Sequence, residues 1–379
     1  MTHQEKKREK IEDEDEPYNA FEGFPNEDDS IEAFEENKSD FIKLMKWLFA
    51  EDKVFEYVKS WISHIIQKPE VKTKVALVIF SKTHGTGKNS FIDGIVAIIG
   101  KLLCGTVESI EDITKNFNAH LCNKLFIYGD EISANAKKVA DRLKQVITRP
   151  TQNLEKKHMD ATEVDDFTNW AFTTNNENCF KNEEGDRRLM MIHAKEDKQT
   201  EISKASYAEL EDPEKLKKLF KFFKNYKQSE ESIKKYKEFN IGSSEVIETE
   251  YKKQMTYENR PSYIQMLYKN TNDFVGKVFQ STTLYEEAQK YAKKHFLSSH
   301  FTGQEMSKSI KNYLKEFFKK GMTCNKYIFP KTRTELSKIL FEVDEPYYRY
   351  INQLEDDFIP DWTPKEDKTD FYNNIIEEE

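Results

Sequence analysis

Short apolar runs alternate with amphipathic stretches through the first half of the chain. The run VALVIF at residues 75–80 has no polar position, which is typical of a strand buried on both faces. Mostly apolar runs follow at residues 124–128 (KLFIY), 169–174 (NWAFTT) and 188–194 (RLMMIHA). Between them, residues 137–147 place apolar side chains three and four positions apart, which predicts a helix. Strands that alternate with helices predict an α/β fold with a mainly parallel central sheet.

Helices are also predicted on both sides of this region. Residues 40–67 show the helical spacing of apolar positions, and residues 196–260 continue it in a stretch rich in Lys, Glu and Tyr. Beyond them, capping-box spacings that begin at Thr283 and at Thr302 predict two helix starts. With a strand-like KYIFP and one more amphipathic helix, this last part is expected to form a winged-helix-like unit.

Charge is distributed unevenly along the chain. The net charge is −9, but residues 1–40 carry −10 and residues 351–379 carry −8, so the remainder is basic. The acidic start buries little apolar surface and is expected to be mobile. A basic body is compatible with a polyanion such as nucleic acid, although lysine-rich surfaces also occur on proteins that bind none.

Other classes of protein are disfavoured by composition. No apolar run is long enough to cross a membrane, and the polar start is unlike a secretory signal. The four cysteines are far apart and show no Cys-x-x-Cys spacing, which disfavours a zinc ribbon or a disulfide framework. A reduced, intracellular protein is therefore expected.

The segment KTHGTGKNSF, residues 82–91, follows the first predicted strand and leads into a predicted helix. It resembles the phosphate-binding loop G-x-x-x-x-G-K-[ST], in which backbone N–H groups and a lysine contact phosphate oxygens. Lys88 is that lysine, but Lys82 replaces the first glycine and Asn89 replaces the Ser or Thr. A glycine turn beside a lysine also arises by chance, yet the strand–loop–helix context favours a nucleotide site.

Polar residues also follow two other predicted strands. Asp130 and Glu131 come after KLFIY, and Asn175 comes after AFTT. Because ligands bind at the carboxyl ends of parallel strands, these side chains are expected near the glycine loop. Amide and carboxylate oxygens are hard-cation ligands, so Mg²⁺ is expected at Asp130 and at either Asn89 or Ser90. The expected nucleotide-binding residues are Gly85, Thr86, Gly87, Lys88, Asn89, Ser90 and Asp130.

The order of these motifs resembles the superfamily 3 helicases, which are AAA+ P-loop ATPases of viruses, phages and plasmids. The glycine loop, Asp-Glu, Lys-Lys-His, Thr-Thr-Asn and Asp-Arg-Arg occur in the family's order. The chain is most similar to the poxvirus-type primase–helicases of large DNA viruses, virophages and related phages. There Gly-x-Gly-Lys-Asn followed by Ser or Thr and Phe is familiar, so Asn89 looks like a family feature. The resemblance covers roughly residues 17–345 and includes no primase domain.

The resemblance implies a role for each site residue. Lys88 matches the phosphate-binding lysine, Asp130 the acid beside the metal, and Glu131 the acid that orients or activates water. Gly129 interrupts the apolar run before the two acids, so they could exchange roles. Asn175 matches the polar sensor that contacts the γ-phosphate or the attacking water.

Two further resemblances concern a neighbouring subunit and DNA. Arg188 matches an arginine finger that reaches the ATP of the next subunit, with Arg187 as its rival. The segment NLEKKHMD, residues 153–160, is similar to the DNA-binding hairpin of polyomavirus large T antigens, and Lys157 and His158 match the residues at its tip. A local ion pair for the arginine and a solvated loop for the hairpin are the simpler alternatives.

The resemblance implies an ATP- and Mg²⁺-dependent DNA helicase that forms a homo-hexameric ring. It would move 3′ to 5′ on single-stranded or forked DNA during viral, phage or plasmid replication, with a primase or polymerase as partner and no membrane. Alternatives are a double-strand DNA translocase or packaging ATPase, and a non-hydrolysing origin-binding or loading module. The expected parts are an acidic mobile segment (1–39), a helical subdomain (40–74), the AAA+ core (75–195), a helical segment (196–270), a winged-helix-like unit (271–345) and an acidic tail (346–379).

Overall fold

The computed structural model describes residues 21–109, 112–113, 121–130, 137–154, 162–176, 186–258, 260–295, 297, 301–313, 326–329 and 331–354. The chain divides into two compact units, Met1–Lys253 and Gln254–Glu379, and each is considered by itself.

A five-stranded sheet forms the centre of the first unit, in the order β2-β3-β6-β1-β7. All four pairings between neighbouring strands are parallel, so the predicted α/β class with a mainly parallel sheet is confirmed. The strands are β1 (Ala76–Phe80), β2 (Cys104–Val107), β3 (Phe126–Gly129), β6 (Asn169–Thr174) and β7 (Leu189–His193).

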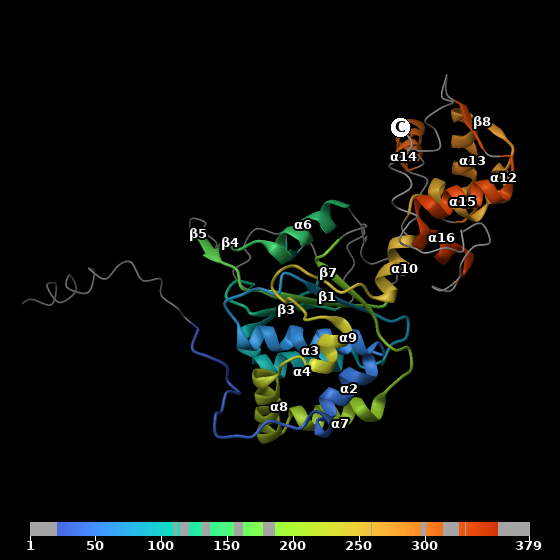
Figure 1. Ribbon diagram of the computed structural model, residues 1–379. Helices are drawn as coiled ribbons and strands as arrows, with labels where there is room; N and C mark the ends of the chain where they lie inside the picture. Colours follow the sequence, from blue (N-terminus) through green and yellow to red (C-terminus); the bar gives the residue numbers. More distant parts are fainter. Residues whose placement is uncertain are drawn as a thin grey trace, which may run out of the picture. The chain divides into compact units, whose positions relative to one another are not determined.

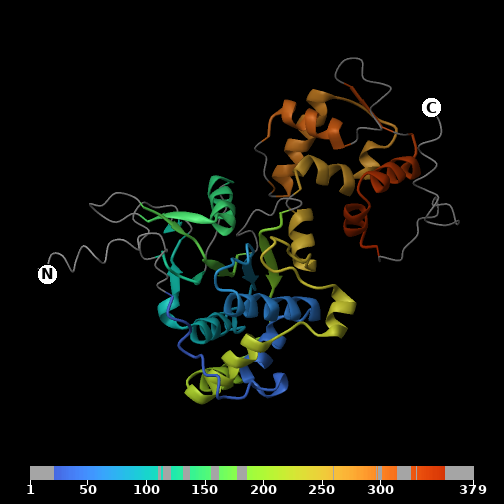
Figure 2. The same cartoon turned by 60° about the vertical axis from the view of Figure 1, so that its left-hand side comes forward.

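Helices cover both faces of this sheet (Figures 1 and 2). α3 (Asp52–Gln67) and α4 (Lys88–Ile99) lie on one face, and α6 (Lys137–Thr148) lies on the other. Successive side chains of a strand point to opposite faces, and Leu77 and Ile79 accordingly belong to the core on the α3 and α4 side. Since both faces are covered, β1 is apolar at every position, as is typical of a parallel sheet.

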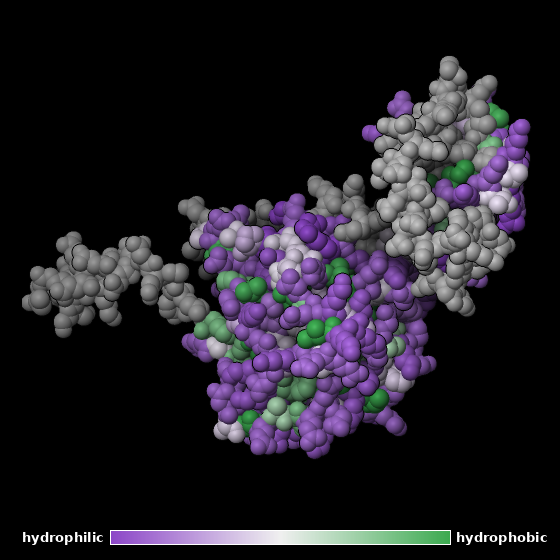
Figure 3. Space-filling model, viewed as in Figure 1, coloured by the Kyte–Doolittle hydropathy of each residue, from purple (hydrophilic) through white to green (hydrophobic). Residues whose placement is uncertain are grey.

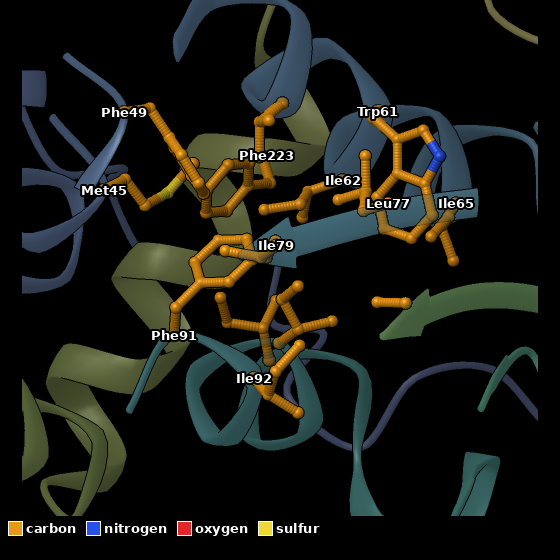
Figure 4. Packing of buried hydrophobic residues seen from close by; sticks show 14 of the residues in the cluster. Met45, Phe49, Trp61, Ile62, Ile65, Leu77, Ile79, Phe91, Ile92 and Phe223 are labelled. Atoms are coloured by element: carbon orange, nitrogen blue, oxygen red, sulfur yellow. The ribbon is translucent and has the colours of Figure 1, made fainter. Parts of the chain in front are cut away.

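Aromatic packing fixes the start of α4 (Figure 4). The ring of Phe91 meets that of Phe49 edge-on, with centroids 5.0 Å apart, and stacks on Phe41 at 6.0 Å. Phe91 is fully buried and follows Lys88 by three residues on the same helix. The hydrophobic core therefore holds the first turn of α4 directly behind the glycine loop.

Further helices complete the first unit on the α3 and α4 side. α2 packs against α7, and α8 packs against α3 and α4. The remaining described elements of this part of the chain are η1 (Glu36–Lys38), α2 (Asp40–Leu48), η2 (Lys101–Leu103), β4 (Thr151–Leu154), β5 (Thr162–Asp165), α7 (Thr200–Leu210), α8 (Pro213–Asn225) and α9 (Glu230–Tyr236), and α10 (Glu250–Glu258) crosses the boundary between the units.

Residues 21–39 were expected to belong to a mobile segment, but they pack against α8. Phe24 packs against Phe220 of α8, with ring centroids 5.4 Å apart, and the Asp28 carboxylate lies 3.1 Å from the Lys217 amine. Net charge alone misled the prediction, because the acidic side chains face lysines of α8 and an apolar side chain anchors the segment. Residues 1–20 and the tail beyond residue 354 lie outside the described residues.

The second unit has its own core of aromatic and aliphatic residues, and a two-stranded antiparallel sheet of β8 and β9. Its helices and strands are α11 (Ser262–Lys269), α12 (Thr271–Phe274), β8 (Val278–Gln280), α13 (Ser281–Lys294), α14 (Gly303–Tyr313), β9 (Lys326–Ile328), α15 (Arg333–Val343) and α16 (Glu345–Asn352). α11 was assigned by sequence to the segment that ends at residue 270. It belongs to this unit instead, because its apolar face packs on α13.

Helix capping in this unit agrees in part with the sequence. Thr302 and Glu305 exchange hydrogen bonds before α14, as predicted. The box predicted at Thr283 is wrong, because α13 already begins at Ser281. Thr332 instead forms a capping box for α15.

The exposed surface is largely polar. The face seen in Figure 3 is hydrophilic over most of the described residues, with small separate hydrophobic spots. No helix among the described residues is long and apolar enough to cross a membrane.

Candidate functional site

The glycine loop, residues 81–88, connects the end of β1 to the start of α4. Gly85 and Gly87 have φ angles of +79° and +101°, which residues with a side chain rarely adopt. A Cβ atom on Gly87 would also lie 3.0 Å from Leu44. Gly87 is the N-cap of α4 and makes no side-chain cap, so the first N–H groups of the helix face the loop without a capping side chain. A helix start of this kind favours an anion.

Lys88 lies inside the loop rather than in solvent. It is 6% exposed, and its amine donates hydrogen bonds to the Ser81 hydroxyl and, over 2.8 Å, to the amide oxygen of Asn175. Thr86 is also buried, with its hydroxyl 3.2 Å from that of Ser81. The loop lysine and the polar residue after β6 thus meet at the carboxyl edge of the sheet, where the sequence placed them.

Asp130 follows β3 at the same edge. One carboxylate oxygen accepts a hydrogen bond from the Asn89 amide over 2.9 Å, and the other accepts from the Thr173 hydroxyl. Asp130 is exposed, whereas Ser90, the other candidate metal ligand, is buried on α4. The side chains of Asn89 and Asp130 are therefore adjacent, and a rotation of the Asn89 amide would bring its oxygen toward a cation held by Asp130.

The described residues contain no cluster of three or more His, Cys, Asp or Glu side chains that could hold a metal ion. A Mg²⁺ ion that arrives with nucleotide phosphates needs fewer protein ligands, usually one or two carboxylates. The exposed Asp130 carboxylate beside Asn89 fits that requirement, and the buried Lys88 with the uncapped start of α4 fits the phosphates.

Glu196, which follows β7, was missed by the sequence reasoning. The Glu196 carboxylate accepts the backbone N–H groups of Lys82 and Thr83, over 2.9 and 2.8 Å, and lies 2.7 Å from His193 Nε2. Burial alone would raise the pKa of Glu196, but these hydrogen bonds together lower that pKa to about 2. Glu196 thus stays ionised and ties the first half of the glycine loop to the end of β7. The position of His193 at a strand end was the available signal.

His84 was also missed. Its Nδ1 atom lies 3.2 Å from the amide nitrogen of Asn175. It comes from the middle of the glycine loop, where the phosphate-loop pattern prescribes no residue type, so no motif indicated it.

Arg188 lies at the opposite edge of the sheet from Lys88. Its carbonyl accepts the N–H of Ala76 at the start of β1, whereas Phe80 at the end of β1 pairs with His193. Four residue steps of strand separate these positions, roughly 13 Å. Arg188 therefore does not lie at the glycine loop of its own chain.

Three of the remaining predicted residues, Glu131, Lys157 and His158, fall outside the described part. Glu131 immediately follows it, and Lys157 and His158 lie between β4 (Thr151–Leu154) and β5 (Thr162–Asp165). These two strands pair antiparallel, with Leu154 opposite Thr162. Arg187, the rival of Arg188, is exposed.

Comparison with known proteins finds a family model that matches part of the chain, including this site. Residues 79–188, from the end of β1 through Arg188, match a family of unknown function, DUF5906. The chain is homologous to the DNA primase-polymerase of Nitratiruptor phage NrS-1. The two are 31% identical over 137 residues, which is 35% of this chain and only 19% of the phage protein.

Solved structures of the C-terminal region of NrS-1 share the fold. An A-form structure matches with a TM-score of 0.51 and 21% identity, over 76% of this chain and 66% of that one. A second structure matches with a TM-score of 0.52 and 18% identity, over 88% and 71% of the two chains. At this level of identity the likeness concerns the fold alone.

Proposed function

We propose that this protein is an ATP-dependent DNA helicase of superfamily 3 type that acts in phage or viral genome replication. The observation that carries the proposal is the meeting of Lys88, Asn175 and Asp130 at one edge of the sheet, beside the start of α4. The homology to a phage primase-polymerase supports a role in replication. A winged-helix-like C-terminal unit and assembly into a ring are also part of the proposal.

The chain's own residues would bind ATP as follows. The N–H groups at the start of α4 and the Lys88 amine contact the β- and γ-phosphates, since both are positively polarised and lie within the loop. Lys88 already bonds the Asn175 oxygen, so Asn175 lies where it can sense the terminal phosphate. Asp130 and Asn89 would hold Mg²⁺, which neutralises charge on the phosphates. Glu131, next to Asp130, orients water.

Arg188 would act in a neighbouring subunit. It lies at the edge of the sheet opposite to Lys88, so a head-to-tail arrangement of copies brings one copy's Arg188 edge to the next copy's glycine loop. An arginine supplied in this way stabilises transition-state charge and is worth about 10³–10⁵ in rate. Hydrolysis would then depend on assembly, in a closed ring for which a hexamer is the expected size.

The hairpin of β4 and β5 would contact single-stranded DNA through Lys157 and His158. A pairing of lysines with phosphates releases counterions, so the affinity for DNA should fall steeply with salt. A primase or polymerase is the proposed partner.

The test is ATP hydrolysis by the full chain with and without single-stranded DNA, for wild type, Lys88→Ala and Glu131→Gln. We expect DNA to stimulate the wild type, Lys88→Ala to lose nucleotide binding, and Glu131→Gln to bind ATP without hydrolysing it. Unwinding of a forked DNA distinguishes a helicase from a double-strand translocase. Nucleotide binding without any hydrolysis by wild type would instead favour a loading module and overturn the proposal.

A further inference from the structure

A buried ion pair lies beside Arg188 at the amino end of β7. The Asp186 side chain is 3% exposed, and one of its carboxylate oxygens lies 2.8 Å from the amine of Lys144 on α6, which is 8% exposed. The other oxygen accepts the backbone N–H of Arg188 over 2.8 Å. One oxygen of this acid thus faces the Lys144 ammonium in an ion pair, although it accepts no hydrogen bond, and the other accepts a backbone N–H.

This arrangement is unexpected on simple electrostatic grounds. A carboxylate is the usual partner of a guanidinium, which matches it with two parallel hydrogen bonds. Asp186 is only two residues from Arg188, yet no ion pair joins their side chains in the described part of the chain. The Arg188 Nε atom is buried there without a hydrogen-bond partner. If the Asp186 charge were not already neutralised, its carboxylate would compete with any other anion for this guanidinium.

We propose that Lys144 is a positioning residue that neutralises Asp186 and thereby keeps the Arg188 guanidinium available to a phosphate of the neighbouring subunit. The inference rests on the proposed function, in which Arg188 acts in trans. It assigns a role to a residue of α6 that touches neither nucleotide nor DNA. Removal of the Lys144 charge would leave the buried Asp186 carboxylate without its ion-pair partner, and the Arg188 guanidinium, whose Nε has no hydrogen bond, could turn to it.

The experiment compares three variants of the full chain in ATP hydrolysis. Lys144→Met leaves Asp186 unpaired, and Lys144→Met/Asp186→Asn removes both charges. Lys252→Met is the matched control. Lys252 is a second buried lysine at this edge; its amine donates to the backbone carbonyls of Asp186 and Leu189, and its charge also acts on the Asp186 carboxylate, so this variant tests whether any nearby positive charge suffices. Thermal unfolding and ATP binding are measured for each variant.

We expect kcat of Lys144→Met to fall at least tenfold with little change in KM, since an arginine in trans is worth about 10³–10⁵ in rate. The double variant should recover kcat to within about threefold of wild type, and Lys252→Met should lower the unfolding temperature without the loss in kcat. If Lys144→Met does not fold, a double variant with nearly the kcat of wild type still supports the inference. It would show that a neutral side chain at position 186 is required, rather than the ion pair itself.

Two results would overturn the inference. One is a folded Lys144→Met variant with the kcat of wild type, and the other is a folded double variant that is as slow as Lys144→Met. Arg188→Ala separates this failure from that of the proposed function. If Arg188→Ala is inactive while Lys144→Met is active, only the inference is wrong. If Arg188→Ala hydrolyses ATP as fast as wild type, the action in trans is wrong, and the inference falls with it.

Discussion

The amide group of Asn175 is oriented from both ends by the glycine loop. Its oxygen accepts a hydrogen bond from the Lys88 amine over 2.8 Å, and its nitrogen lies 3.2 Å from Nδ1 of His84. Because an amide nitrogen only donates, Nδ1 of His84 must be the acceptor and carry no proton. The loop that would bind phosphate therefore also sets the direction of the residue proposed to sense it.

His84→Ala should lower kcat for ATP hydrolysis by about tenfold, because Asn175 loses one of the two contacts that orient it. His84→Asn should keep most of the activity, since its amide oxygen can accept in place of Nδ1. His84→Gln carries the same amide on a side chain that is one methylene longer, so it is the control for the position of the oxygen. Steady-state kinetics of the three variants decide the matter, and equal activity of the Ala and Asn variants would contradict this role.

Asn89→Ala should raise the Mg²⁺ concentration needed for half-maximal hydrolysis by about tenfold, the size of effect seen when a partner of a metal ligand is removed. The physical reason is the 2.9 Å contact between the Asn89 amide and the Asp130 carboxylate. Ser90→Ala is the matched control, and a Mg²⁺ titration of both variants measures the effect. A larger effect of Ser90→Ala would assign the metal to Ser90 instead.

The thermal stability of the protein should rise between pH 8 and pH 10 through Lys72. Burial lowers the pKa of Lys72 from 10.5 to about 8, although Asp166, 3.2 Å away, partly offsets this effect. Between these two pH values the unfolded chain binds a proton that the folded chain does not, so stability increases with pH.

Lys72→Met should flatten this increase in the unfolding temperature, as measured by calorimetry from pH 7 to pH 10. Burial raises the pKa of the Cys104 thiol from 9.0 to about 12, which opposes the effect from about pH 9, and buried tyrosines such as Tyr57, whose pKa burial raises, oppose it above about pH 10. An unchanged slope in Lys72→Met would show that Lys72 does not titrate in this range.

The sequence was sufficient for the strands whose residues form a clear apolar run. β1 and β6 are buried at every position, so their apolar runs stand out from the helices around them. β2 was missed because of its composition rather than its place at the edge, since the other edge strand, β7, has an apolar run that was recognised. Its four residues include Gly105 and an exposed Thr106, which a strand pattern does not favour.

The same distinction holds for the site. Lys88, Asp130 and Asn175 were predictable because each follows a buried strand, and parallel strands bring such residues to one edge. Glu196 and Lys144 were not, because their contacts join positions more than 40 residues apart and depend on how α6 and the end of β7 pack. Side chains that orient other groups carry no motif of their own.

The central claim is that ATP bound at one copy's glycine loop is hydrolysed with the Arg188 of the next copy. Its most direct test mixes full-length Lys88→Ala and Arg188→Ala proteins, each inactive alone, at equal concentrations. Random assembly would place an intact Lys88 beside an intact Arg188 at about a quarter of the contacts between copies. We predict roughly a quarter of the wild-type ATPase rate in the presence of single-stranded DNA. Mixtures that remain inactive at every ratio, although both proteins assemble, would contradict the account.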